Sequence, residues 1–206
     1  MFGAGQIFTM MFVMLGPLKL LGPFAAQTRE LEDAQIRRIA LTVFAIALAA
    51  AVGGCFVGRQ LLTAWAVSTP ALVLAAAIVL FLVALRIVLE QYQPARPPAE
   101  PLPPEAAAAA MRLVFPLVLT PYGIATLIAL IASSETARET WLIFAMLTGV
   151  MLLNLGAMLL ARKVMHGTLL LVLYVLGAVL GVLQVALAVQ MIVRQLAILG
   201  LIDVPG

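Results

Sequence analysis

A lysine stands between two Gly-Pro pairs in the first apolar stretch of the chain, where residues 15–24 read LGPLKLLGPF. A proline gives a helix no N–H donor and leaves the carbonyl one turn earlier without its partner. The ammonium of Lys19 has three N–H donors, so it could bind such freed carbonyls or the carboxylate of a small solute. Both interpretations stay open at the level of sequence.

A second apolar stretch, residues 115–126 with the sequence FPLVLTPYGIAT, is interrupted in a similar way by Pro116 and Pro121. Stretches broken at corresponding places in two halves are typical of a substrate site near the middle of a membrane. The alternative is that both are ordinary kinks, because proline is common in membrane helices. Asn154, Gln184 and Gln190 could complete a cavity, although a single polar residue in a membrane helix more often joins two helices. The predicted substrate-binding residues are Gly16, Pro17, Lys19, Gly22, Pro23, Thr120, Pro121, Tyr122, Gly123, Thr126 and Gln190.

The composition places these stretches in an integral membrane protein. The chain has 206 residues, of which 65% are hydrophobic and 10% are charged, and its mean hydropathy is +1.17. Soluble domains of this size do not reach such values. The nine acidic residues all lie between apolar runs or at their ends, so no carboxylate is expected inside the membrane.

Six apolar runs are each close to the ~20 residues that a helix needs to cross a bilayer, and they lie at about 7–27, 39–58, 69–89, 113–132, 141–161 and 169–192. The runs do not alternate in polarity as barrel strands do, so the predicted fold is all-α. A proline-rich linker, 91–105, separates a first three-helix repeat, 1–90, from a second, 106–206. Because three is odd, related halves must be inverted. We expect helix 1 to be broken at both Gly-Pro pairs, between Gly16 and Phe24, and helix 4 to be broken between Leu119 and Gly123. Glu105 before five alanines predicts a helix start.

The distribution of Lys and Arg predicts the orientation. Arg59, Arg138 and Arg194 lie on one side of the predicted membrane, and eight basic residues lie in the three loops of the other side: Arg29, Arg37, Arg38, Arg86, Arg96, Arg112, Arg162 and Lys163. Loops rich in Lys and Arg stay in the cytoplasm. Both termini are therefore expected outside.

The two broken stretches resemble motifs of the MarC family, the six-span neutral amino acid transporters. The family's first motif, Asp-Pro-(Ile/Leu)-Gly-x-x-Pro-x-Phe, is occupied here by residues 16–24, and its fourth-span motif, Pro-Leu-Leu-Ala-Gly-Pro-Gly-Ala-Ile-Ala-Thr, by residues 116–126. The resemblance extends over nearly the whole chain. It implies a multi-pass protein of the bacterial inner (plasma) membrane with both termini periplasmic.

This chain departs from the family pattern at charged and small positions. The family aspartate is Gly16, its first glycine is Lys19, and the family's Gly-Pro-Gly is Thr120-Pro121-Tyr122. An ammonium in place of a carboxylate repels cations and favours an anionic or zwitterionic solute. Two hypotheses follow: a MarC-like transporter of small amino-acid-like solutes, or a non-transporting accessory subunit of a larger membrane protein complex. On the first, introducing Asp at positions 16 and 19 together should favour cations.

No pattern in the sequence supports catalysis. The chain has no nucleophile–base pair, metal-ligand cluster or phosphate loop, so we expect no enzyme, no cofactor and no metal. The expected partners are the lipid bilayer, a small zwitterionic or anionic solute, and a second copy of the chain or a larger membrane complex, with no nucleic acid. Gly54 with Gly58, and Gly177 with Gly181, have the spacing of close helix contacts inside the chain or in a dimer.

Overall fold

The computed structural model describes residues 4–90, 102–103, 105–134, 136–164 and 168–202. The described residues form helices and no strand, which confirms the predicted helical class. The helices are α1 (Ala4–Leu15), α2 (Leu18–Gln27), α3 (Asp33–Ala64), α4 (Thr69–Glu90), α5 (Ala106–Leu113), the π-helical turn η1 (Val114–Val118), α6 (Pro121–Ala132), α7 (Ala137–Val164) and α8 (Thr168–Ile198).

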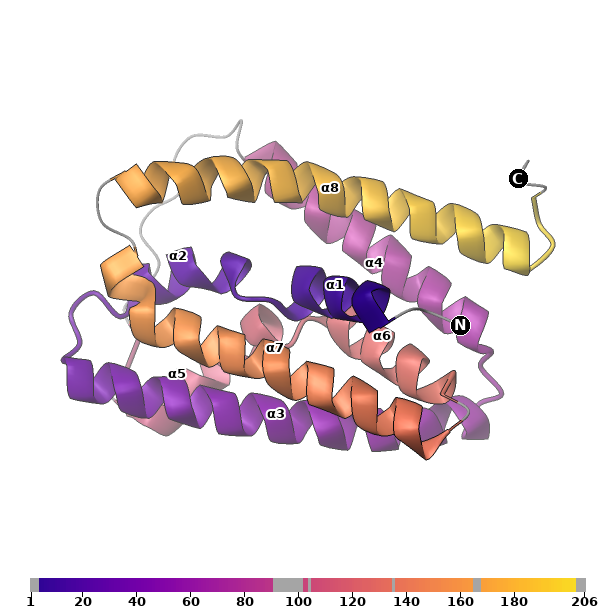
Figure 1. Cartoon of the computed structure of the whole chain (residues 1–206), viewed down its shortest axis with the longest axis horizontal. Helices are drawn as coiled ribbons and strands as arrows, with labels where there is room; N and C mark the ends of the chain where they lie inside the picture. The colour runs from indigo at the N-terminus through magenta and orange to yellow at the C-terminus, as the bar shows by residue number, and fades with distance from the viewer. Residues whose placement is uncertain (1–3, 91–101, 104, 135, 165–167, 203–206) are drawn as a thin grey trace.

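The helices run up and down an elongated bundle (Figure 1). Helix α3 packs against α5, α6 and α7, while α7 packs against α1 and α2. Helix α4 packs against α8 and α6. The start of α1 and the end of α8 lie at one end of the bundle (Figure 1). The opposite end, which holds the start of α3 and the end of α7 with Arg37, Arg38 and Arg162, is called the basic end below.

Five segments are long and apolar enough to cross a membrane: Met10–Gln27, Asp33–Ala64, Thr69–Arg86, Ala137–Lys163 and Ala178–Ile198. The remaining predicted run, 113–132, is divided between η1 and α6. The 12 residues of α6 cover only about 18 Å of the roughly 30 Å of hydrocarbon. The sixth span therefore stays a prediction.

The outer surface of the bundle fits a lipid environment. Large apolar side chains such as Phe56, Leu82 and Leu183 are exposed, although a soluble protein would bury most of them. Trp65 at the end of α3 is 71% exposed, and Trp141 near the start of α7 is 73% exposed. Both lie at the end of the bundle away from the basic end (Figure 1). Exposed tryptophans at one level are typical of a membrane–water interface.

Two local predictions are confirmed. Helix α5 begins at Ala106, directly after Glu105. Helix α3 approaches α6 at Gly58, where an added Cβ would lie 2.3 Å from Cδ1 of Ile128. The small-residue contact of the second run is thus internal. The surroundings of Gly177 are not among those that the structure describes, so the prediction for Gly177 and Gly181 lies outside the described residues.

Overpacking at this contact should loosen the bundle. Gly58→Leu forces a side chain into Ile128, so we expect a loss of about 1–3 kcal/mol in the free energy of unfolding. The matched control is Gly53→Leu, because an added Cβ at Gly53 meets no atom within 4 Å. Thermal unfolding of both purified variants in detergent measures the difference. Equal melting temperatures would contradict the assigned contact.

Candidate functional site

The first break lies between α1 and α2, at Gly16 and Pro17. Pro17 cannot donate a hydrogen bond to the carbonyl of Val13, one turn earlier. An added Cβ at Gly16 would lie 1.9 Å from the carbonyl oxygen of Phe12, so the turn accepts only glycine there. Helix α2 restarts at once, with the carbonyl of Pro17 accepting hydrogen bonds from the N–H groups of Leu20 and Leu21.

Side chains from distant helices satisfy the carbonyls at the end of α1. Nε2 of Gln184, on α8, donates to the carbonyl of Val13 at 3.2 Å. Nδ2 of Asn154, on α7, donates to the carbonyl of Leu15 at 2.6 Å. The break is therefore held by polar side chains that lie more than 130 residues away in sequence.

The carbonyl of Met14, between these two, binds the lysine. Nζ of Lys19 donates to it, and so does Oγ1 of Thr120 at 3.3 Å. The ammonium also lies 5.7 Å from the ring centre of Tyr122, within the range of a cation–π contact. Lys19 thus contacts a carbonyl freed by the first break and an aromatic ring next to the second.

The second Gly-Pro pair does not break the helix. Gly22 and Pro23 lie inside α2, and the side chain of Pro23 is exposed. The expectation that both pairs interrupt the first run is wrong for this pair. A proline inside a helix removes one hydrogen bond, here to the carbonyl of Lys19, and a helix can tolerate that loss. Gly22 and Pro23 therefore lie apart from the contacts at the end of α1.

The second break lies earlier than the sequence predicted. The backbone leaves the helical region at Phe115, with φ −128° and ψ 129°, and is extended again at Leu119 and Thr120. Pro121 is the first residue of α6, where its missing N–H has no helical partner to lose. Oγ1 of Thr120 caps this helix by accepting a hydrogen bond from the N–H of Gly123 at 3.2 Å. The expected break over residues 119–123 thus shifts to 115–120.

The two breaks touch each other. An added Cβ at Gly123 would lie 2.5 Å from Cδ2 of Leu15. Oγ1 of Thr126 lies 3.1 Å from the sulfur of Met14 and donates to the carbonyl of Tyr122 at 2.8 Å. The structure therefore brings six of the predicted residues to one place, namely Gly16, Lys19, Thr120, Tyr122, Gly123 and Thr126.

The side chains of two other predicted residues lie apart from this place, and two further polar residues join it. Gln190 is exposed on α8, so the structure does not bring it to the breaks. Gln184, six positions earlier, makes the contact to α1 instead. Pro121 contributes the start of α6, and its own side chain is exposed. Asn154 was predicted only as a residue that could complete the cavity. Its hydrogen bond to the carbonyl of Leu15 is shorter than that of Gln184 to the carbonyl of Val13.

Asn154 leaves one polar atom without a partner. Its side chain is 2% exposed, and its Oδ1 accepts no hydrogen bond from any described residue. A buried acceptor without a donor costs about 1–3 kcal/mol. Such an atom is suited to accept a hydrogen bond from a ligand.

The comparison with known families agrees with this layout. The family described as MarC family integral membrane protein matches residues 3–199. The chain belongs to the MarC family. The match includes both breaks and the helices that satisfy them. No curated protein and no solved structure matches the chain.

Proposed function

We propose that this MarC family protein transports small amino-acid-like solutes and binds them where the two breaks meet. The observation that carries the proposal is the arrangement around two neighbouring carbonyls. Lys19 binds the carbonyl of Met14, and Asn154 binds the next carbonyl, that of Leu15. An ammonium and an unpaired amide oxygen are thereby held close to the same turn of backbone.

These two groups suit the two charges of an amino acid. The ammonium of Lys19 has three N–H donors, so donors remain for a substrate carboxylate after the bond to Met14. Oδ1 of Asn154 can accept a hydrogen bond from the substrate's ammonium group. A zwitterion would satisfy both sites and add no net charge to the site. A simple cation would meet Lys19 and be repelled.

The contacts between helices support an inverted repeat. In such a repeat α1–α2 corresponds to α5–α6, α3 corresponds to α7, and α4 corresponds to α8. The packing of α3 on α5 and α6 then corresponds to the packing of α7 on α1 and α2. The pairs α4 with α8 and α3 with α7 each correspond to themselves, and the packing of α4 on α6 corresponds to the contact of α8 with α2. On this proposal residues 1–90 and 106–206 form two inverted halves, and α5 to α6 is the sixth span. The basic end then faces the cytoplasm and both termini face the periplasm of a bacterial inner membrane.

Transport can be tested with the purified protein in liposomes. Uptake of labelled neutral amino acids should exceed that of empty liposomes and should be competed by unlabelled substrate. A matching test with amines that lack a carboxylate should give no uptake, because these cations meet Lys19 alone. Uptake of the amines with none of the amino acids would contradict the proposed site.

One observation favours the accessory subunit as a second candidate. Oγ1 of Thr120 binds the carbonyl of Met14 and caps α6, and Gly123 packs directly on Leu15. Such a junction could be purely structural in a relative that has lost transport. This candidate predicts a folded protein that takes up no neutral amino acid, whichever residue occupies position 19.

A further inference from the structure

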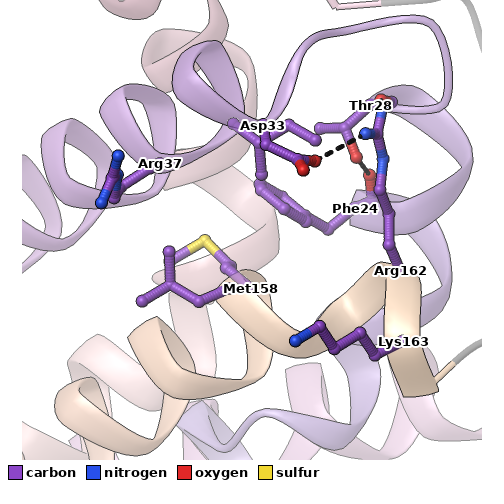
Figure 2. A pocket seen from close by; sticks show the side chains of 9 residues that line it. Phe24, Thr28, Asp33, Arg37, Met158, Arg162 and Lys163 are labelled. Atoms are coloured by element: carbon purple, nitrogen blue, oxygen red, sulfur yellow. Dashed lines mark hydrogen bonds and ion pairs between the residues drawn. The ribbon is translucent and has the colours of Figure 1, made fainter.

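A separate cavity lies at the basic end of the bundle. It has a volume of about 510 Å³ and lies between α2, α3 and α7. Figure 2 shows Arg37 on α3 and Lys163 on α7 on different sides of it, with Met158 between them. The cavity is distinct from the junction of the breaks, because none of the residues at that junction lines it.

One of the three basic residues that line the cavity has a structural role. Arg162 pairs with Asp33 at 2.9 Å and donates to the carbonyl of Thr28 at 2.7 Å. It also donates to the carbonyls of Arg29 and Leu31. These bonds, of which Figure 2 marks the one to Asp33, fix the segment after α2 to the end of α7.

The other two basic residues have no such partners. Within the described part of the chain, Arg37 and Lys163 make no ion pair and no side-chain hydrogen bond, and both are exposed. The carboxylate of Asp33 already pairs with Arg162. The cavity therefore presents two uncompensated positive charges, which attract an anion.

Apart from Thr28 and Asp33, the rest of the lining is apolar, and it continues onto the outer surface. The buried wall of the cavity is formed by Phe24, Ile36 and Met158. Leu159, on α7, also lines the cavity and is 43% exposed. The next residue, Leu160, is 51% exposed on the surface that fits a lipid environment. A ligand with an anionic head and an apolar tail matches this basic cavity and the apolar surface beside it better than a free anion does.

We propose that this cavity binds the phosphate group of an anionic phospholipid, with Arg37 and Lys163 as its ligands. The acyl chains extend from Leu159 along the outside of α7. Basic pockets between membrane helices on the cytoplasmic side favour anionic head groups. Because Phe24 and Thr28 belong to the end of α2, a bound lipid also holds the helix that carries Lys19. The proposal does not depend on transport.

The test compares lipid binding by the wild type and by the double variant Arg37→Gln/Lys163→Gln. Native mass spectrometry of the full chain counts bound phosphatidylglycerol against phosphatidylcholine, and thermal unfolding measures the stabilisation each lipid gives. We expect the wild type to prefer phosphatidylglycerol and the double variant to bind it roughly ten- to thirtyfold more weakly. The matched control is Arg38→Gln/Arg59→Gln, which removes the same charge from α3 outside the cavity.

Three results would overturn the proposal. Equal binding of phosphatidylglycerol by the wild type and the double variant would show that Arg37 and Lys163 do not hold the lipid. An equal loss in the control would show that only net charge matters. Inorganic phosphate that stabilises the wild type as well as phosphatidylglycerol does would identify a free anion as the ligand. Full binding and stability in the control variant would show that the loss belongs to the cavity.

Discussion

Lys19→Met should abolish the uptake of neutral amino acids and leave the protein folded in the membrane. Methionine has a similar length and no charge, so it is inexpensive in an apolar helix. The methionine side chain has no N–H donor, so the substitution removes the group that we assign to the substrate carboxylate. Removing one partner of a buried, hydrogen-bonded charge pair weakens binding by roughly thirtyfold or more. Uptake by liposomes that hold equal amounts of each protein measures the effect.

The control for this variant is Arg59→Met, which removes one positive charge from an exposed position of α3 far from the breaks. It should keep the uptake of the wild type. If Lys19→Met also keeps that uptake, the lysine only satisfies the carbonyl of Met14, and its role in substrate binding is wrong.

Gly16→Ala should be the most destabilising small substitution in the first break. The added Cβ would lie 1.9 Å from the carbonyl oxygen of Phe12 and 2.9 Å from its carbonyl carbon. These are backbone atoms, so the end of α1 must move and disturb the contacts of Met14 and Leu15. We expect a loss at or above the upper end of about 1–3 kcal/mol, measured as a lower melting temperature in detergent.

Gly22→Ala is the matched control, because an added Cβ there meets no atom within 4 Å. Inside α2 alanine is a better helix former than glycine by roughly 0.5–1 kcal/mol, so this variant should be equally or more stable. Equal destabilisation by both substitutions would contradict the described turn. The same crowding means that Asp at position 16 restores the family pattern only if the end of α1 moves.

Local chemistry explains what the sequence could predict. Pro17 weakens a helix because it has no N–H, and the chain is interrupted there, between α1 and α2, as expected. Glu105 before alanines marks a helix start, and α5 begins where expected. The second break was placed a few residues late because Pro121 occupies the first position of α6, where proline starts a helix as readily as it ends one. Proline alone does not say which of the two it does.

The partners of the freed carbonyls depend on tertiary packing. Gln184 and Gln190 are both glutamines in one apolar run, and only the rotation of α8 decides which faces α1. That rotation follows from the packing of α8 on α4, which no local pattern in the sequence specifies. The role of Asn154 at Leu15 is set in the same way. The sequence therefore predicted the first break and the approximate place of the second. It named Asn154 and Gln184 only as candidates, and the carbonyls that they bind follow from the packing.

If a solute binds where the two breaks meet and is then transported, this junction must open to water on each side of the membrane in turn, and cysteine labelling detects such opening. Cys55 is the chain's single cysteine and is buried, so Cys55→Ala gives a background without thiols. In that background Thr126→Cys places a thiol at the junction, Ser133→Cys is the exposed control at the end of α6, and Ala188→Cys is the buried control on α8. We expect a membrane-impermeant thiol reagent to label position 126 from either side of the membrane, and a neutral amino acid to slow the labelling. A folded Thr126→Cys protein that is labelled from neither side, like Ala188→Cys, would contradict the account.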